Sequence, residues 1–262
     1  MLELRIAWRS ELGAREANED AVRVGRAGDA CYALLADGAG GHARGAEASQ
    51  RAVDAIERAL RTAGPDFATD VLVGAVQEAH AELQQVQRGA AGRERMHTTL
   101  VALWIDAARG QALWAHVGDS RLYRFRHGRA ERLTVDDSVV QRMVEGGLLT
   151  PEQAHRHPQR NQLVSALGMD DAVEPMAPDR PEAIDEGDAF LLCCDGWWDA
   201  LDDVLLARTL AAAPTPEDWL ADMQRRIVAR AIPRQDNFSA VAVWVGDPAQ
   251  STRFMSDDDT VP

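Results

Sequence analysis

The sequence has no excess of positive charge. Its 28 basic residues, all of them arginine, stand against 42 aspartates and glutamates, which gives a formal net charge of −14. A chain this acidic repels nucleic-acid phosphates and anionic lipid headgroups, so general affinity for either is excluded. The acidity fits cation binding, but a solvated surface that keeps a protein dispersed has the same composition. The positions of the carboxylates must decide between these two readings.

Long hydrophobic runs and paired cysteines are also missing. No apolar run approaches the roughly 20 residues that span a bilayer, and the first residues lack the pattern of a secretory signal. We therefore expect a cytoplasmic protein with no membrane partner. The three cysteines, Cys31, Cys193 and Cys194, form neither a disulfide framework nor a CxxC metal pair. We interpret them as small buried apolar residues in strands.

The rest of the composition is that of an ordinary globular chain. Hydrophobic residues make up 46% and charged residues 27%, and a mass of 28.6 kDa suffices for one large domain with a substantial core. We find no internal repeat and expect this domain to cover residues 1–246. The segment 247–262 has few apolar residues and a run of three aspartates, so we predict a disordered acidic tail.

Hydrophobic periodicity predicts both strands and helices. Apolar or alternating runs bounded by turn residues predict strands over 2–8, 31–36, 100–105, 111–117, 121–126, 190–194 and 240–245. Short connections predict antiparallel hairpins at 105–111 and 125–131. Helical spacing predicts amphipathic helices over 47–62 and 67–87, with further helices at 139–144, from 151, at 202–213 and at 216–230.

Aspartates mark the ends of several predicted strands. Asp37, Asp119 and Asp195 each follow an apolar run beside a glycine, and Asp236 precedes the last run. Any one of them is typical of a turn. If the strands are neighbours, however, the carboxylates meet at one sheet edge and repel one another unless cations lie among them. Their hard oxygen atoms suit Mg²⁺ or Mn²⁺ and not zinc, and glycine beside an aspartate lets its carbonyl approach the ion.

An ordered series of motifs resembles the metal-dependent serine/threonine protein phosphatases of the PP2C type, in their bacterial form. The matching segments are GAREANED (13–20), ADGAGGHARGAEAS (36–49), TTLVAL (98–103), VGDSRLYRFRHG (117–128), LTVDDS (133–138), EGDAFLLCCDGWWD (186–199) and DNFSAVAVWV (236–245). They keep the family's order and spacing from residue 12 to residue 245. The resemblance implies an α+β fold, a four-layer α/β/β/α sandwich of two mostly antiparallel sheets flanked by helix pairs, with a flap over about 146–168.

The resemblance also implies a centre that binds two ions of Mn²⁺ or Mg²⁺. By position in the motifs, Asp37 bridges the two ions and the Gly38 carbonyl binds one of them. Asp195 and Asp236 hold the other. Asp119, together with Asp195, matches the position that holds a weaker third ion in bacterial members.

Further positions match residues that support the metals or act on the substrate. Glu19 and Asp20 match positions that hold the ions directly or through water. Arg15 has a planar fork that pairs with phosphate oxygens. His42 fits a general acid that protonates the departing serine or threonine oxygen, since its reference pKa lies near neutrality.

The function that this resemblance implies is hydrolysis of phosphoserine and phosphothreonine in proteins. Water held between the two ions attacks phosphorus, and no covalent phosphoenzyme is needed. The partners would be phosphorylated proteins, a cognate Ser/Thr kinase and its substrates among them, and we expect a monomer. A non-catalytic module of the same fold that binds a phosphoprotein or kinase would lack a metal aspartate, and none is missing. A phosphodiesterase of unrelated fold would need histidine-rich motifs, which are absent.

The sequence departs from the family pattern in a few places. His97 stands where a glycine usually precedes the Thr-Thr pair, and Asp137 replaces the common histidine of the LTxDHS segment. Neither position is a principal metal ligand. Trp197 and Trp198 follow a predicted buried strand, where tryptophans more often anchor a core than line a substrate site.

Overall fold

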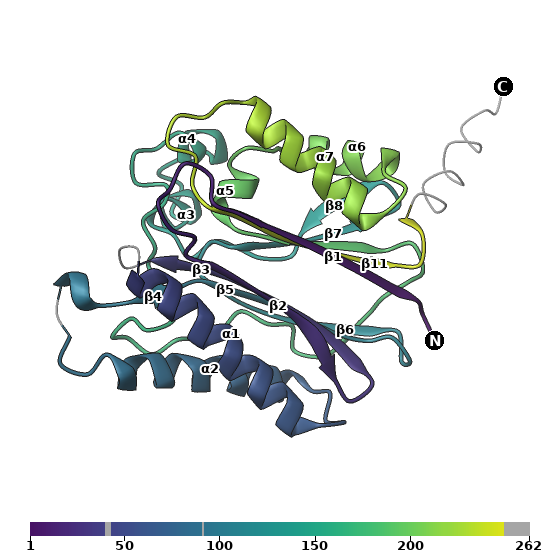
Figure 1. Cartoon of the computed structure of the whole chain (residues 1–262), viewed down its shortest axis with the longest axis horizontal. Helices are drawn as coiled ribbons and strands as arrows, with labels where there is room; N and C mark the ends of the chain where they lie inside the picture. Colours follow the sequence, from purple (N-terminus) through teal and green to yellow (C-terminus); the bar gives the residue numbers. More distant parts are fainter. Residues whose placement is uncertain (40–42, 91, 249–262) are drawn as a thin grey trace.

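The computed structural model describes residues 1–39, 43–90 and 92–248. Two β-sheets face each other, and a pair of helices covers the outer face of each sheet (Figure 1). This arrangement is the four-layer α/β/β/α sandwich that the sequence predicts. Both termini of the described chain lie at the same end of the sheets, since β1 and β11 pair from Leu4 with Val245 to Glu11 with Phe238.

The first sheet combines the two ends of the chain. Its strands, in spatial order, are β1 (Leu4–Glu11), β11 (Phe238–Val245), β10 (Ala189–Cys193), β7 (Arg121–Arg126) and β8 (Arg129–Arg132), and all neighbours are antiparallel. The last strand of the sequence therefore lies between the first strand and β10. The second sheet contains β2 (Asp20–Ala27), β3 (Ala30–Ala39), β5 (Leu100–Asp106), β6 (Gln111–Val117) and β9 (Glu182–Ala183), with the short β4 (His97–Thr98) paired to β3.

Helices cover both sheets. The second sheet packs against α1 (Ala43–Ala63) and α2 (Thr69–Val86), and the first against α6 (Asp203–Ala212) and α7 (Pro216–Ala229). The shorter helices are α3 (Val139–Glu145), α4 (Pro151–His155), α5 (Asp195–Trp198) and the 3₁₀ turn Gly92–Glu94. Helix α4 begins at the predicted capping box, in which Thr150 and Gln153 satisfy each other's backbone N–H groups. In the described part of the chain, no helix is both long enough and apolar enough to cross a membrane.

Two hydrophobic clusters hold the layers together. Strand β3 contributes to both, because successive side chains of a strand point to opposite faces. Leu35 belongs to the cluster that fills the space between the sheets and extends under α7 around Trp219. Leu34 and Tyr32 belong to the cluster under α1 and α2. The central strands are buried on both faces, which explains their nearly continuous apolar runs.

The structure corrects the sequence analysis in several places. Strand β2 was not predicted, because arginines interrupt its apolar residues. The predicted first strand, 2–8, begins and ends two to three residues too early. The interpretation of the cysteines is right for Cys193, which is buried in β10, but Cys31 is only partly buried and Cys194 lies outside the strand as the N-cap of α5. The predicted tail falls almost entirely on 249–262, outside the described residues.

Candidate metal centre

Five aspartates converge at one end of the sandwich. Asp20 opens β2 directly opposite Asp37 near the end of β3. Asp195 is the first residue of α5, immediately after β10, and Asp236 precedes β11. Asp119 lies in the turn between β6 and β7. The sheet edge predicted from the strand ends therefore exists, with Asp20 added from a strand that was not predicted.

The pKa values of these carboxyls show how closely they interact. Burial is the largest cause in each case, because it disfavours the charged form. It raises the pKa of Asp20 to about 6 and that of Asp195 to about 7, and the negative charge of Asp236 adds to both shifts. The pKa of Asp37 lies well above its usual value, and it is raised by burial and then by the charges of Asp20, Asp195, Asp119 and Asp236.

Two oxygen atoms of the cluster lack a hydrogen-bond donor. Within the described residues, Asp20 Oδ1 and Asp195 Oδ1 are buried and have no partner, although each residue as a whole is only partly buried. An unpaired buried carboxylate oxygen is costly, and a divalent cation removes both the desolvation cost and the repulsion. Carboxylates are the ligands that Mg²⁺ and Mn²⁺ prefer. The residues present therefore fit a divalent-cation centre.

Gly38 and Glu19 lie beside this cluster. A Cβ atom on Gly38 would come within 2.2 Å of the Gly45 carbonyl oxygen and 2.7 Å of that of Glu19. A Cβ atom on Gly45 would in turn meet Glu19 Oε2 at 2.1 Å and the Gly38 carbonyl oxygen at 3.0 Å. Only glycine fits at position 38, and a larger residue at position 45 would have to displace the Glu19 carboxylate, so the start of α1 packs directly against the backbone of β3. The Gly38 carbonyl and the Glu19 carboxylate are consequently close together, as the predicted ligand set requires.

A hydrogen-bond network that the sequence analysis missed supports Asp20. Ser239 Oγ donates to Asp20 Oδ2 at 2.6 Å and lies 2.8 Å from Ser10 Oγ, which accepts from Asn18 Nδ2 at 2.8 Å. The Cys194 thiol also donates to Asp20 Oδ2, at 3.4 Å, and accepts from the Ser239 amide at 3.1 Å. Cys194 thus serves this network and is more than an apolar core residue. Side chains alternate between the two faces of β11, and this alternation turns Ser239 toward the aspartates. It is the sequence signal from which this network could have been predicted.

Asn237 fastens the segment that carries Arg15. Its side-chain amide donates to the carbonyl oxygens of Leu12 and Ala17, at 2.8 and 3.0 Å, and its Oδ1 accepts from the Glu19 amide at 2.9 Å. These bonds fix both ends of the loop between β1 and β2 against the start of β11. The sequence analysis included Asn237 in a matched motif but assigned it no role.

Arg15 lies at the mouth of the centre. Its guanidinium forms an ion pair with Asp236 Oδ2, and the Arg15 side chain remains 47% exposed. Both residues line a cavity of about 210 Å³ that also contains Asp195 and Asp199. Arg15 can therefore reach an anion that enters this cavity. His42, the predicted general acid, lies outside the described residues.

The backbone around Asp119 is held from two sides. Trp198 Nε1 donates to the Asp119 carbonyl oxygen at 2.9 Å. Asp137 Oδ2 accepts from the Gly118 amide at 3.0 Å, and burial raises the pKa of the Asp137 carboxyl. The departure from the family pattern at Asp137 therefore supports the turn that presents Asp119. Trp197 is completely buried in the core, as expected. Trp198 forms part of the wall of a second cavity.

The predicted flap contacts the centre directly. Asn161 Nδ2 donates to Asp195 Oδ2 at 3.2 Å, and Arg160 Nη2 pairs with Asp199 Oδ2 at 3.2 Å. Both residues belong to the polar stretch that follows α4. The C-terminal end of this predicted segment is joined to the rest of the chain by antiparallel bridges, Leu163 with Ser138 and Leu167 with Thr98.

Comparison with known proteins gives the family. A sequence model of protein phosphatase 2C matches residues 9–235. The serine/threonine protein phosphatase PstP of Mycobacterium tuberculosis is 35% identical over 249 residues, which cover 94% of this chain and 46% of PstP. Protein phosphatase PhpP of Streptococcus pneumoniae is 34% identical over 198 residues, which cover 74% of this chain and 78% of PhpP.

A solved structure agrees with these matches. The catalytic domain of PstP in complex with two manganese ions superposes with a TM-score of 0.81 at 31% identity, covering 94% of this chain and 100% of that one. This chain spans about half the length of the whole PstP protein. The matches extend over nearly all the segments that build the two sheets and the aspartate cluster, and they confirm the resemblance seen in the motifs. The chain belongs to the protein phosphatase 2C family.

Proposed function

We propose that this chain is a metal-dependent phosphoprotein phosphatase that hydrolyses phosphoserine and phosphothreonine. The observation that carries the proposal is the aspartate cluster, in which two buried oxygen atoms have no donor among the described residues and an exposed arginine stands at the entrance. Relatives named as serine/threonine protein phosphatases, and a similar catalytic domain that holds two manganese ions, support it.

The cofactor would be Mn²⁺ or Mg²⁺. We assign Asp37 as the bridge between two ions, with Gly38 on one ion and Asp195 and Asp236 on the other, while Asp119 and Asp195 serve a weaker third. When bound, such cations lower the pKa of a water molecule and offset negative charge on a phosphate group. Most of the assigned donors are hard carboxylate or carbonyl oxygens, and among the described residues no histidine joins the cluster of Asp20, Asp37 and Cys194, which supports this choice of metal.

Arg15 would bind and orient the phosphate. Its guanidinium pairs with Asp236 and is half-exposed, so it can exchange this carboxylate oxygen for oxygens of a substrate phosphate. Two parallel N–H donors fix the orientation of the group and stabilise charge that grows on its oxygens during the reaction. Asp20 would hold the ions directly or through water, and Glu19 would support the metal site beside it.

His42 would protonate the departing serine or threonine oxygen. Its support is the sequence alone: it lies four residues beyond Gly38 in the matched glycine-rich segment. A histidine with an ordinary pKa is partly protonated at neutral pH and can deliver a proton to an alkoxide leaving group.

The organisation and partners of the protein complete the proposal. Residues 1–246 would form the phosphatase domain, with a flap over about 146–168. The substrates would be phosphorylated proteins, including a cognate Ser/Thr kinase and the proteins it phosphorylates. We propose a monomer that acts in the cytoplasm.

Phosphate release from a phosphothreonine peptide tests this function. Activity should require Mn²⁺ or Mg²⁺, disappear with a chelator, and fall by several orders of magnitude in Asp37→Asn and Asp236→Asn. Asp29→Asn is the matched control, because Asp29 lies exposed in the turn at the far end of the hairpin that carries Asp37. Equal release by all of these proteins, with and without chelator, would exclude the proposed function.

A further inference from the structure

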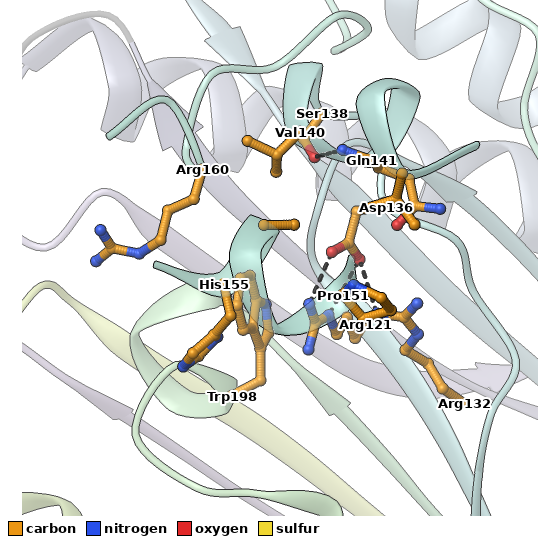
Figure 2. Close-up of a pocket in the computed structure, with 12 residues that line it drawn as sticks. Arg121, Arg132, Asp136, Ser138, Val140, Gln141, Pro151, His155, Arg160 and Trp198 are labelled. Atoms are coloured by element: carbon orange, nitrogen blue, oxygen red, sulfur yellow. Dashed lines mark hydrogen bonds and ion pairs between the residues drawn. The ribbon is translucent and has the colours of Figure 1, made fainter. Parts of the chain in front are cut away.

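A second cavity, of about 310 Å³, lies between helices α3 and α4 and strands β7 and β8 of the first sheet (Figure 2). We call it the flap cavity. Its basic lining comes from separate elements, with Arg121 at the start of β7, Arg132 at the end of β8, His155 at the end of α4 and Arg160 beyond α4. The remaining wall is largely apolar and includes Val140, Val144, Pro151, Ala154 and Trp198.

The charges inside the flap cavity do not balance. Asp136 is the one acidic residue that lines it. Arg121 donates to both Asp136 oxygens, at 3.0 and 2.7 Å, and both side chains are largely buried, so these two charges neutralise each other. Arg160 pairs with Asp199, which stands outside the lining and also lies 3.9 Å from His155 Nδ1. Among the arginines of the lining, Arg132 is therefore the one whose charge is not offset by a close partner.

The guanidinium of Arg132 has no acceptor within hydrogen-bond length among the described residues. Its guanidinium lies 3.7 Å from Asp136 Oδ1, beyond hydrogen-bond length, and its side chain is 32% exposed. Across residues 1–39, 43–90 and 92–248, this is the one ion pair that the Arg132 side chain makes. It can therefore give its donors to an incoming anion without breaking a strong bond in the protein.

The flap cavity adjoins the metal centre. Arg160 lines both the flap cavity and the cavity that contains Arg15 and Asp236. Trp198 forms part of the wall, with the Arg121 guanidinium carbon 3.5 Å from its ring centroid, and its Nε1 holds the Asp119 carbonyl. A peptide whose phosphorylated residue enters the metal centre therefore passes this cavity within a few residues, given about 3.3–3.6 Å of reach per extended residue.

We propose that the flap cavity is a specificity subsite for an acidic side chain of the substrate, close in sequence to the phosphorylated residue. A glutamate combines a short apolar stem with a carboxylate, which matches the apolar wall and the unneutralised Arg132. The site would also counteract the general repulsion between this acidic chain and acidic substrates. The inference deepens the proposed phosphatase function and rests on it.

A peptide series tests the subsite on the unmodified protein. Glutamate is moved one position at a time along both sides of a phosphothreonine, and each peptide is compared with its glutamine counterpart at saturating Mn²⁺. At one or two adjacent positions, glutamate should raise kcat/KM roughly three- to tenfold, mainly through KM, and added salt should reduce this preference. A flat profile would overturn the proposal, as would a preference that appears only when a second phosphate replaces the glutamate.

Two variants of the same strand locate the effect. In Arg132→Gln the ratio of kcat/KM for the glutamate and glutamine peptides should fall toward one. In Arg129→Gln it should stay at the wild-type value, because Arg129 is exposed at the other end of β8 and does not line the cavity. Thermal unfolding of both variants checks that they fold. Equal ratios in the two variants would contradict the assignment to Arg132.

Binding separates failure of the subsite from failure of the proposed function. Affinity for peptides that carry a non-hydrolysable phosphonate is measured by fluorescence anisotropy, which needs no turnover. If the protein hydrolyses nothing but binds the glutamate peptide more tightly than Arg132→Gln does, the phosphatase function has failed and the subsite stands. If it hydrolyses every peptide equally and shows no difference in binding, the subsite has failed and the function stands.

Discussion

Asp20 faces Asp37 across the antiparallel strands β2 and β3, and one oxygen atom of each lies within 4.8 Å of the other. Like charges directly opposite each other on neighbouring strands destabilise a sheet. Here the pair is also coupled to Asp195, Asp119 and Asp236. Repulsion between these carboxylates therefore destabilises the β2–β3 hairpin that carries Asp20 and Asp37.

Stabilisation by Mg²⁺ should increase with pH. The pKa values of Asp20 and Asp195 are raised to about 6 and about 7, from 3.8, so the metal-free folded protein holds more protons than the unfolded chain within that window. The contribution of these two carboxyls to the stability of the metal-free protein is therefore lost as pH rises from about 4 to about 7. A cation competes with those protons. The increase in Tm on adding Mg²⁺ should be small at pH 5.5 and several degrees larger at pH 8, measured by calorimetry; an equal increase at both pH values would contradict this.

Asp37→Asn should stabilise the metal-free protein while it abolishes the response to metal. The substitution removes the charge that faces Asp20 and keeps the shape of the side chain. The backbone bond from the Asp37 amide to Thr99 Oγ1 is unaffected. We expect a gain of about 1 kcal/mol in the free energy of unfolding in chelator, from denaturant titration. Asp29→Asn, in the turn of the same hairpin, should change neither quantity, and a loss of stability in Asp37→Asn would refute the repulsion argument.

Ser239→Ala should weaken metal binding more than it affects folding. Ser239 donates to Asp20 Oδ2, and loss of a group that orients a metal ligand typically costs 10- to 100-fold in affinity. We expect about tenfold weaker Mn²⁺ binding in isothermal titration calorimetry. Ser239→Thr keeps the hydroxyl and should restore most of the affinity. Equal affinities of the alanine and threonine variants would show that the hydroxyl is dispensable.

His116 should make the protein less stable in mild acid. It is completely buried in β6, neither ring nitrogen has a partner among the described residues, and burial lowers its pKa to about 4 from 6.5. His116 is therefore protonated below about pH 6.5 in the unfolded chain but only below about pH 4 in the folded protein. This difference costs up to about 3 kcal/mol of stability as pH falls through that window.

The variant His116→Leu isolates this contribution. It removes the titration, so its free energy of unfolding should depend less steeply on pH between 6.5 and 4 than that of the wild type. His127→Asn is the control, since His127 is exposed in a turn with φ of 51°, a conformation that asparagine tolerates. Parallel pH profiles for wild type and His116→Leu would rule out His116 as the cause.

Local patterns predict most of the long strands and helices and place several aspartates at strand ends, whereas the four-layer arrangement followed from the resemblance of the motifs to a known family. Asp37, Asp119 and Asp195 punctuate apolar runs, and antiparallel neighbours bring such ends to a common edge. Strand β2 escaped detection because Arg23 and Arg26 break its alternation; Arg23 lies partly buried beside Asp54 of α1, a tertiary contact that local pattern cannot show.

The supporting contacts could not be predicted in the same way. Ser239 and Asp20 are 219 positions apart in the sequence, and Arg15 and Asp236 are 221 apart. Composition suggested that Cys194 is buried, which is right, but gave no indication that its thiol would face a carboxylate. The flap cavity is equally invisible in sequence, because its basic residues come from β7, β8, α4 and the segment after α4, whose packing defines it.

The place of β11 in the first sheet has a consequence for the order in which the protein can become active. Asp236 and β11 are the last parts of the described domain to leave the ribosome, yet β11 inserts between β1, made first, and β10. Asp20 and Asp37 come from one sheet, whereas Asp195 and Asp236 come from the other. A nascent chain therefore cannot complete the cluster before both sheets have been made. Synthesis itself delays the appearance of a complete metal centre until the final strand has closed the sandwich.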